Sequence, residues 1–200
     1  MTTCFYGGSF NPPHLGHVAA AEAVAAALQP ERFLIIPDRV PPHKEMAEGS
    51  PTPQQRLELC RLAFASVPDA EVTDLELLRE GRSYSVDTVA ALREQYPEDE
   101  LVLVLGSDML LGFELWFRFE EILRECTLAA LSRVGNDTEE LQQCAQTLRE
   151  KYGARICFVE HSPVVISSSE IRDALRQGSG QEYLTPGEWA YIRENGLYGI

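Results

Sequence analysis

The 200-residue sequence lacks the features that mark membrane proteins and disulfide-rich proteins. No apolar run approaches the roughly 18 residues of a membrane-spanning helix, and no basic leader precedes the first apolar segment. The five cysteines are odd in number and scattered among apolar or helical segments, so we expect reduced core residues instead of a disulfide framework. These absences predict a cytosolic protein.

Positive charge is also scarce. There are 17 lysines and arginines against 31 aspartates and glutamates, which gives a formal net charge of -14. A general nucleic-acid-binding surface needs a basic face that displaces counterions, so the composition argues against one. A phosphorylated small molecule needs only a few local cations. The basic residues that stand beside motifs are therefore the candidates for phosphate contacts, namely His14, His17, Lys44 and Arg172.

Short apolar segments alternate with helical patterns along the chain. We predict strands at residues 3–6, 33–37, 101–105, 127–131 and 156–159, and helices at 15–28, 53–66, 85–95, 138–150 and 168–176. This alternation predicts an α/β fold, a Rossmann-like, doubly wound parallel sheet with helices on both faces. We expect a single domain over residues 1–200, with ligands at the carboxyl ends of the strands.

Residues 7–17, with the sequence GGSFNPPHLGH, follow the first predicted strand. We expect Gly7 and Gly8 to let the backbone turn sharply and approach a ligand closely. His14 and His17 bracket the predicted helix start, where free amides and the positive end of the helix dipole suit a phosphate, and their spacing puts both rings on one face. Capping plus chance is the plain alternative. A zinc site is disfavoured, because no cysteine or carboxylate cluster supplies further ligands at suitable spacing.

Residues 166–172, with the sequence ISSSEIR, open the helix predicted at 168–176. On the structural interpretation a serine caps the helix and Glu170 supports the cap. On the functional one the hydroxyls and free amides bind a polyphosphate while Arg172 adds a charge-assisted fork. The residues alone leave the two interpretations equal.

Three further strings have a structural and a functional interpretation. Residues 38–55 are rich in proline, glycine and charge and predict a mobile loop, in which Lys44 is either part of a rigid turn or a contact to an acceptor phosphate. Gly106-Ser107-Asp108 follows the most buried strand, where the aspartate could merely cap a helix, and the later Trp116-Phe117 pair could merely be core. Residues 82–88 place hydroxyls before a helix that Ser85 or Asp87 could cap.

His14-Leu15-Gly16-His17 closely resembles the signature of the HxGH nucleotidyltransferases, which transfer a nucleotidyl group between ATP or CTP and a phosphate-bearing acceptor. Residues 166–172 match the superfamily's Ile-Ser-Ser-Thr-x-Ile-Arg motif, except that Ser169 replaces threonine. Residues 41–44, with the sequence PPHK, and the helical pattern at 188–198 are similar to the bacterial nicotinate mononucleotide adenylyltransferases.

The resemblance implies that AMP passes from ATP to nicotinate mononucleotide, forming nicotinate adenine dinucleotide and pyrophosphate, with magnesium carried by ATP and not by a protein site. The implied catalytic residues are His14, His17, Arg172 and Lys44. The implied ATP-binding residues are Gly7, Gly8, Ser9, Phe10, His14, Gly16, His17, Gly106, Asp108, Ile166, Ser167, Ser168 and Arg172. The implied residues for nicotinate mononucleotide are Ser9, Lys44, Tyr84, Ser85, Asp108, Trp116, Phe117 and Arg133.

Two alternatives stay open. The same chemistry could act on nicotinamide mononucleotide or phosphopantetheine, or the chain could be a catalytically silent nucleotide-binding regulator. The first motif also departs from the usual pattern, with Ser9 where threonine is common and Asn11 where aspartate is common. Both keep a hydrogen-bonding group, but Asn11 removes a negative charge near the phosphates. The sequence does not indicate the oligomeric state.

Overall fold

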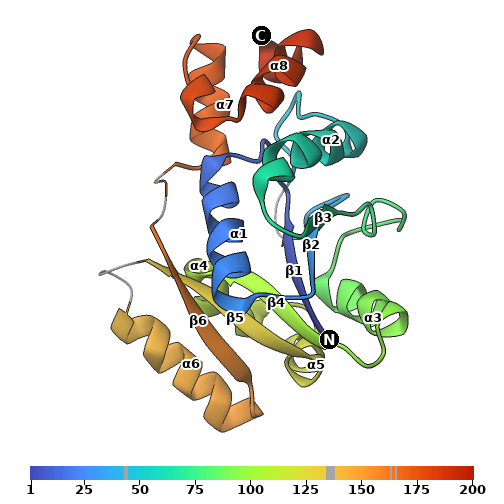
Figure 1. The fold of residues 1–200 in the computed structure, drawn as a ribbon, viewed down its shortest axis with the longest axis vertical. Helices are drawn as coiled ribbons and strands as arrows, with labels where there is room; N and C mark the ends of the chain where they lie inside the picture. The colour runs from blue at the N-terminus through green and yellow to red at the C-terminus, as the bar shows by residue number, and fades with distance from the viewer. Residues whose placement is uncertain (43–44, 134–137, 163, 165) are drawn as a thin grey trace.

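The computed structural model describes residues 1–200 apart from 43–44, 134–137, 163 and 165. Within these residues six parallel strands form one sheet (Figure 1), β1 (Thr2–Gly8), β2 (Arg32–Pro37), β3 (Ala70–Val72), β4 (Glu100–Gly106), β5 (Cys126–Arg133) and β6 (Arg155–His161). Their order is β3-β2-β1-β4-β5-β6, so the winding reverses between β1 and β4. This confirms the predicted doubly wound, Rossmann-like sheet.

Helices cover both faces of the sheet, because successive side chains of a strand point to opposite sides. Phe5 of β1 packs on one side with α3 (Ser85–Gln95), α4 (Ser107–Leu111), α5 (Phe119–Glu125) and α6 (Thr138–Tyr152). Cys4, the preceding residue, packs on the other side with α1 (Leu15–Leu28) and α2 (Pro53–Ala63). Each face of the sheet therefore has its own apolar core.

A third apolar cluster lies beyond the carboxyl edge of the sheet. It joins Leu59 of α2 to α7 (Ser168–Arg176), α8 (Pro186–Glu194) and the 3-10 turn η4 (Leu197–Gly199). Figure 1 shows α7 and α8 at the top of the molecule, beside the start of α1. Shorter 3-10 turns are η1 (Phe64–Ser66), η2 (Phe113–Leu115) and η3 (Gln181–Tyr183). The chain from α7 to the C-terminus thus returns to the end of the first strand.

The strands and helices predicted from periodicity are all present, and the differences concern short elements. The prediction missed β3, α4 and α5, which have three, five and seven residues and are too short to show a period. The helix predicted at 53–66 is α-helical only to Ala63 and ends in the η1 turn. Residues 43–44 of the predicted mobile loop lie outside the described residues, and its mobility stays a prediction.

The turn after β1 differs from the expectation. The strand continues through Gly8, and it is Phe10 that takes a left-handed conformation, with φ of 44°. A Cβ on Gly8 would lie 3.1 Å from the Phe10 ring. The prediction that the glycine pair makes the turn is therefore wrong; Gly8 instead leaves room for a ring that is buried beneath the loop.

A buried arginine ties the end of β1 to the end of β2. Arg56 of α2 is only 1% exposed, and its guanidinium donates to the carbonyls of Ser9 (2.6 Å), Asp38 (2.7 Å) and Arg39 (3.1 Å). It also pairs with the Asp38 carboxylate at 3.2 Å, whose other oxygen accepts from the Ser9 hydroxyl at 2.7 Å. The segments that follow β1 and β2 are thus both held by Arg56, a residue that the sequence analysis did not identify.

None of the helices in the described ranges is long and apolar enough to cross a membrane. All five cysteines are free, as expected, and burial raises the pKa of the Cys4 and Cys126 thiols to about 12. Those two thiols are therefore protonated at neutral pH and unsuited to nucleophilic attack.

Replacing Arg56 by methionine should lower the free energy of unfolding by about 3–5 kcal/mol, because the Asp38 carboxylate would stay buried without its partner. The matched control is Arg61→Met on the same helix, where the side chain is 53% exposed and pairs only with Glu58; it should change stability by about 0.5 kcal/mol or less. Urea unfolding measures both. Equal small losses would show that the buried pair does not hold the loop.

Candidate active site

The two histidines of the first motif lie together at the start of α1. His14 is the N-cap residue, with extended backbone angles, and its Nδ1 accepts a hydrogen bond from the Gly16 amide at 3.1 Å. The ring centroids of His14 and His17 are 3.8 Å apart. The prediction that both rings share one face is confirmed, and so is the capping interpretation of His14.

This cap decides which proton His14 carries. An imidazole whose Nδ1 accepts from an amide has its proton on Nε2 when neutral, so Nε2 is the donor. Burial lowers the pKa of His14 from 6.5 to about 4, which keeps the ring neutral at physiological pH. The expectation that the first α1 amides stay free is wrong at Gly16, whose N–H is used by the ring. Instead of the Gly16 amide, the Nε2–H of the His14 ring is the hydrogen-bond donor that the start of the helix offers to a ligand.

Gly16 is required by the position of the His14 ring. A Cβ on Gly16 would lie 2.9 Å from two atoms of that ring and 3.2 Å from the Val164 carbonyl. Neither contact is compatible with the present packing. The glycine between the histidines is thus explained by close approach, since its backbone is not left-handed.

The second motif lies directly against the first. Ser168 donates to the Pro12 carbonyl at 2.8 Å, and Arg172 donates to the Asn11 carbonyl at 2.6 Å. Arg172 also donates to the hydroxyl of Ser169 at 3.0 Å. The hydroxyl of Ser169, the residue that replaces the usual threonine, therefore accepts a hydrogen bond from Arg172. These contacts join segments separated by 156 and 161 positions.

The start of α7 follows the structural interpretation as well. Ser167 is the N-cap, its hydroxyl accepts from the Glu170 amide at 3.2 Å, and the Glu170 carboxylate accepts from the Ser167 amide at 2.7 Å. The Ser167 hydroxyl also donates to this carboxylate at 2.7 Å, and the hydrogen bonds from the Ser167 hydroxyl and amide lower the pKa of the Glu170 carboxyl. The cap and the contacts of Ser168 and Arg172 coexist, because different residues of the motif make them.

A pocket of about 150 Å³ opens between the carboxyl ends of β1, β4, β5 and β6. It is lined by Tyr6, His14, Gly16, His17, Ala20, Gly106, Ser107, Asp108, Leu131, His161 and Val164. Asp108 is exposed in the first turn of α4 and makes no capping bond, so the capping interpretation of this residue is wrong. Tyr6 and His161 are lining residues that sequence analysis missed, because nothing in their local sequence marks them.

Three of the predicted acceptor-binding residues, Tyr84, Ser85 and Phe117, lie at the start of α3, whereas Asp108 lines the pocket described above. The rings of Tyr84 and Phe117 are 4.7 Å apart, and Phe117 is 52% exposed. No side chain caps α3, so the capping interpretation of Ser85 and Asp87 is wrong. Trp116 lies more deeply, with its ring centroid 4.9 Å from that of Phe113.

The segment after β2 is held beside this helix start. The Ser83 amide donates to the Val40 carbonyl at 2.8 Å, and the Arg39 amide donates to the Ser83 hydroxyl at 3.0 Å. This brings the chain that leads to residue 44 toward α3. Lys44 itself lies outside the described residues, as does the side chain of Arg133, so their predicted roles are not tested.

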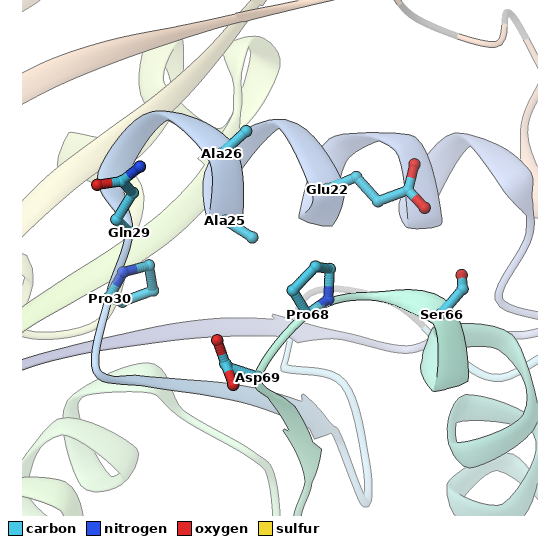
Figure 2. A pocket seen from close by; sticks show the side chains of 8 residues that line it. All are labelled: Glu22, Ala25, Ala26, Gln29, Pro30, Ser66, Pro68 and Asp69. Atoms are coloured by element: carbon cyan, nitrogen blue, oxygen red, sulfur yellow. The ribbon is translucent and has the colours of Figure 1, made fainter.

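A larger pocket, of about 420 Å³, lies elsewhere (Figure 2). It opens between the C-terminal half of α1 and the turn before β3, and it is lined by Glu22, Ala25, Ala26, Gln29, Pro30, Ser66, Pro68 and Asp69. Its ionisable side chains, Glu22 and Asp69, are both acidic, and none of the predicted site residues is among its lining. A pocket with these charges repels phosphates. The smaller pocket at the switch point is the candidate site, because His14, His17 and Asp108 line it.

The described residues include no group of three histidines, cysteines or carboxylates that could hold a metal ion. His14 and Arg172 offer N–H donors beside the first motif, which match phosphate oxygens, and the Asp108 carboxylate lines the same pocket as His14.

Known proteins resemble this chain in sequence and in fold. The cytidylyltransferase-like family model matches residues 5–174. A protein of Carboxydothermus hydrogenoformans, named probable nicotinate-nucleotide adenylyltransferase, is 39% identical over 96% of both chains. One of the same name from Geobacter metallireducens is 37% identical over 99% of this chain and 98% of its own.

A solved structure shows the same fold at lower identity. The Plasmodium falciparum nicotinic acid mononucleotide adenylyltransferase complexed with NaAD has a TM-score of 0.79 and 19% sequence identity, covering 98% of this chain and 97% of its own. The same protein complexed with APC gives a TM-score of 0.79 at 18% identity.

We expect His14 to titrate with a pKa of about 4, measured by NMR of its ring carbons. Because its pKa is lower in the folded than in the unfolded state, the unfolded state binds more protons between about pH 4 and 6.5, so this residue reduces stability as the pH falls through that window. Gly16→Ala should push the ring toward solvent and raise its pKa. Gly112→Ala, where a Cβ meets nothing closer than 3.7 Å, is the control. A wild-type His14 that titrates near 6.5 contradicts the buried cap.

Proposed function

The chain belongs to the family of nicotinate-nucleotide adenylyltransferases, and we propose that its pocket at the carboxyl edge transfers AMP from ATP to nicotinate mononucleotide. The products are nicotinate adenine dinucleotide and pyrophosphate. The observation that carries the proposal is the contact of Arg172 and Ser168 with the loop before His14. It brings the Arg172 guanidinium to the loop that leads to His14 and His17, the two imidazoles that line the pocket.

The reaction needs positioning more than acid–base chemistry. An oxygen of the acceptor's 5′-phosphate attacks the α-phosphorus of ATP, a new phosphorus–oxygen bond forms, and the bond to the bridging oxygen of the β-phosphate breaks. Pyrophosphate leaves with that electron pair. A phosphate monoester is already ionised near neutral pH, so no strong base is required. Catalysis then comes from aligning two anions and from stabilising charge on the phosphoryl oxygens and the leaving group.

The N–H donors of the site suit these tasks. His14 is a neutral ring that donates a hydrogen bond from Nε2 to a phosphoryl oxygen. This hydrogen bond becomes stronger as negative charge develops on that oxygen in the transition state, and the ring does not have to be protonated first. His17, 3.8 Å away between ring centroids, supplies the second imidazole. Arg172 carries a fixed positive charge beside the start of α7 and holds the leaving pyrophosphate.

The acceptor binds on the other side of the switch point. The start of α3 has first-turn amides without a side-chain cap, which suit the nicotinate carboxylate, and Tyr84 and Phe117 offer ring faces to a planar pyridine. Lys44 and Arg133 are assigned to the acceptor by family resemblance. Asp38 and Arg56 are positioning residues, because they fix Ser9 and the segment after β2.

Magnesium enters with ATP in this proposal. It neutralises part of the polyphosphate charge and keeps most of its ligands as water and phosphate oxygens. The protein's own task is to bind the phosphates through N–H groups.

The acceptor is tested by pyrophosphate release with nicotinate mononucleotide, nicotinamide mononucleotide and phosphopantetheine at identical ATP and magnesium concentrations. We expect the highest kcat/KM with nicotinate mononucleotide, because the amides at the start of α3 favour an anion over a neutral amide. A preference for phosphopantetheine would overturn the proposed acceptor. Absence of turnover with all three would favour the catalytically silent regulator.

His17→Ala should lower kcat by about a hundredfold or more, because one donor to the transition state is lost. The free energy of unfolding should change little. Glu22→Ala, at an exposed position of the same helix, serves as the matched control and should keep the wild-type rate. Steady-state kinetics with nicotinate mononucleotide measures both variants, and a wild-type rate for His17→Ala would assign that ring a structural role only.

A further inference from the structure

A third histidine lines the pocket, and the mechanism above does not use it. His161 is the last residue of β6, at the carboxyl edge of the sheet, and is half-buried. Its Nδ1 lies 3.2 Å from the carbonyl oxygen of Ser132 on the neighbouring strand β5. Because a carbonyl only accepts, Nδ1 carries the proton of the neutral ring, and Nε2 is left as an acceptor. The Ser132 carbonyl thus selects one tautomer.

The order of the strands indicates which part of ATP comes near this ring. The residues proposed to bind the acceptor substrate lie near the carboxyl end of β2, because residues 39–40, which follow this strand, contact Ser83 before α3. The phosphate-binding groups lie at the exit of β1, where α7 meets the first motif. The pocket continues from there toward β4, β5 and β6. If the acceptor and the phosphates bind as proposed above, the ends of β5 and β6 are the part of the pocket left for the nucleoside of ATP.

We propose that His161 recognises the base of the donor nucleotide, its Nε2 accepting a hydrogen bond from the 6-amino group of adenine. This inference rests on the proposed function only for the direction in which ATP lies. A 6-oxopurine presents an oxygen acceptor at the same place, opposite the Nε2 lone pair. The ring could adapt by moving its proton to Nε2, but it would then lose the hydrogen bond to the Ser132 carbonyl. The fixed tautomer therefore makes His161 a specificity-determining residue that favours ATP over inosine triphosphate.

The test compares binding of ATP and inosine triphosphate by calorimetry, with magnesium and without acceptor. We expect the wild-type protein to bind ATP about tenfold or more tightly than inosine triphosphate. His161→Ala should weaken ATP binding about five- to tenfold and leave inosine triphosphate within about twofold, so that the selectivity disappears. His161→Phe keeps a ring of similar size without the acceptor and should lose the selectivity as well.

The matched control is Glu160→Ala, since Glu160 is the exposed neighbour on the same strand and is not among the pocket residues. It should keep the wild-type ratio of the two dissociation constants. In turnover, His161→Ala should raise the KM for ATP with little change in kcat or in the KM for nicotinate mononucleotide. A structural role alone would not produce this split.

Two results would overturn the proposal. One is a folded His161→Ala or His161→Phe protein that keeps the wild-type preference for ATP. The other is an equal loss of binding for ATP and inosine triphosphate, which would assign His161 to packing of the strand end. A wild-type protein that shows the binding selectivity but no turnover of nicotinate mononucleotide would instead contradict the proposed function alone, because the binding assay contains no acceptor.

Discussion

The hydrogen bonds from Ser168 and Arg172 to the carbonyls of Pro12 and Asn11 are the constraint on which the site depends. They connect the start of α7 to the loop that leads into α1, although most of the chain separates the two. Without them the guanidinium and the imidazoles would belong to different parts of the surface. The third apolar cluster supports this contact, because Ile171 and Leu175 of α7 pack with Leu197 and Tyr198 near the end of the chain.

Hydrogen bonds from α1, α2 and α7 hold the first motif in place. Arg56 binds the Ser9 carbonyl from α2, Arg172 binds the Asn11 carbonyl from α7, and the Gly16 amide binds the His14 ring from α1. A loop that must present its own groups to an anion cannot use them all for secondary structure, so side chains from outside satisfy its carbonyls. Placing cations on those carbonyls also raises the local positive potential in a chain whose net charge is -14.

In the proposed reaction, the reversal of strand order divides the site into a donor half and an acceptor half. Side chains at the ends of β4, β5 and β6 line the pocket with His14 and His17, whereas the segment after β2 lies with the start of α3. Two phosphorylated substrates can therefore enter from different sides and meet at β1, where the helix starts favour anions. The larger pocket behind α1 lies away from this edge, and its carboxylates fit neither substrate.

Local pattern was enough to predict the parallel sheet, the principal helices and the two motifs, because strand and helix periodicity and turn residues act over a few positions. It could not show that Phe10 makes the turn after β1, that the Gly16 amide is used by His14, or that Arg56 is almost fully buried. It also did not identify His161, because an isolated histidine at the end of a strand cannot be assigned to a site from local sequence. Only the neighbouring strands bring it into the pocket that His14 and His17 line. Each of these depends on contacts between residues far apart in the chain. The sequence by itself determined which chemical groups are present and which elements hold them, while only the tertiary structure decided which of those groups meet, because parallel strands align their ends across long separations that no local pattern records.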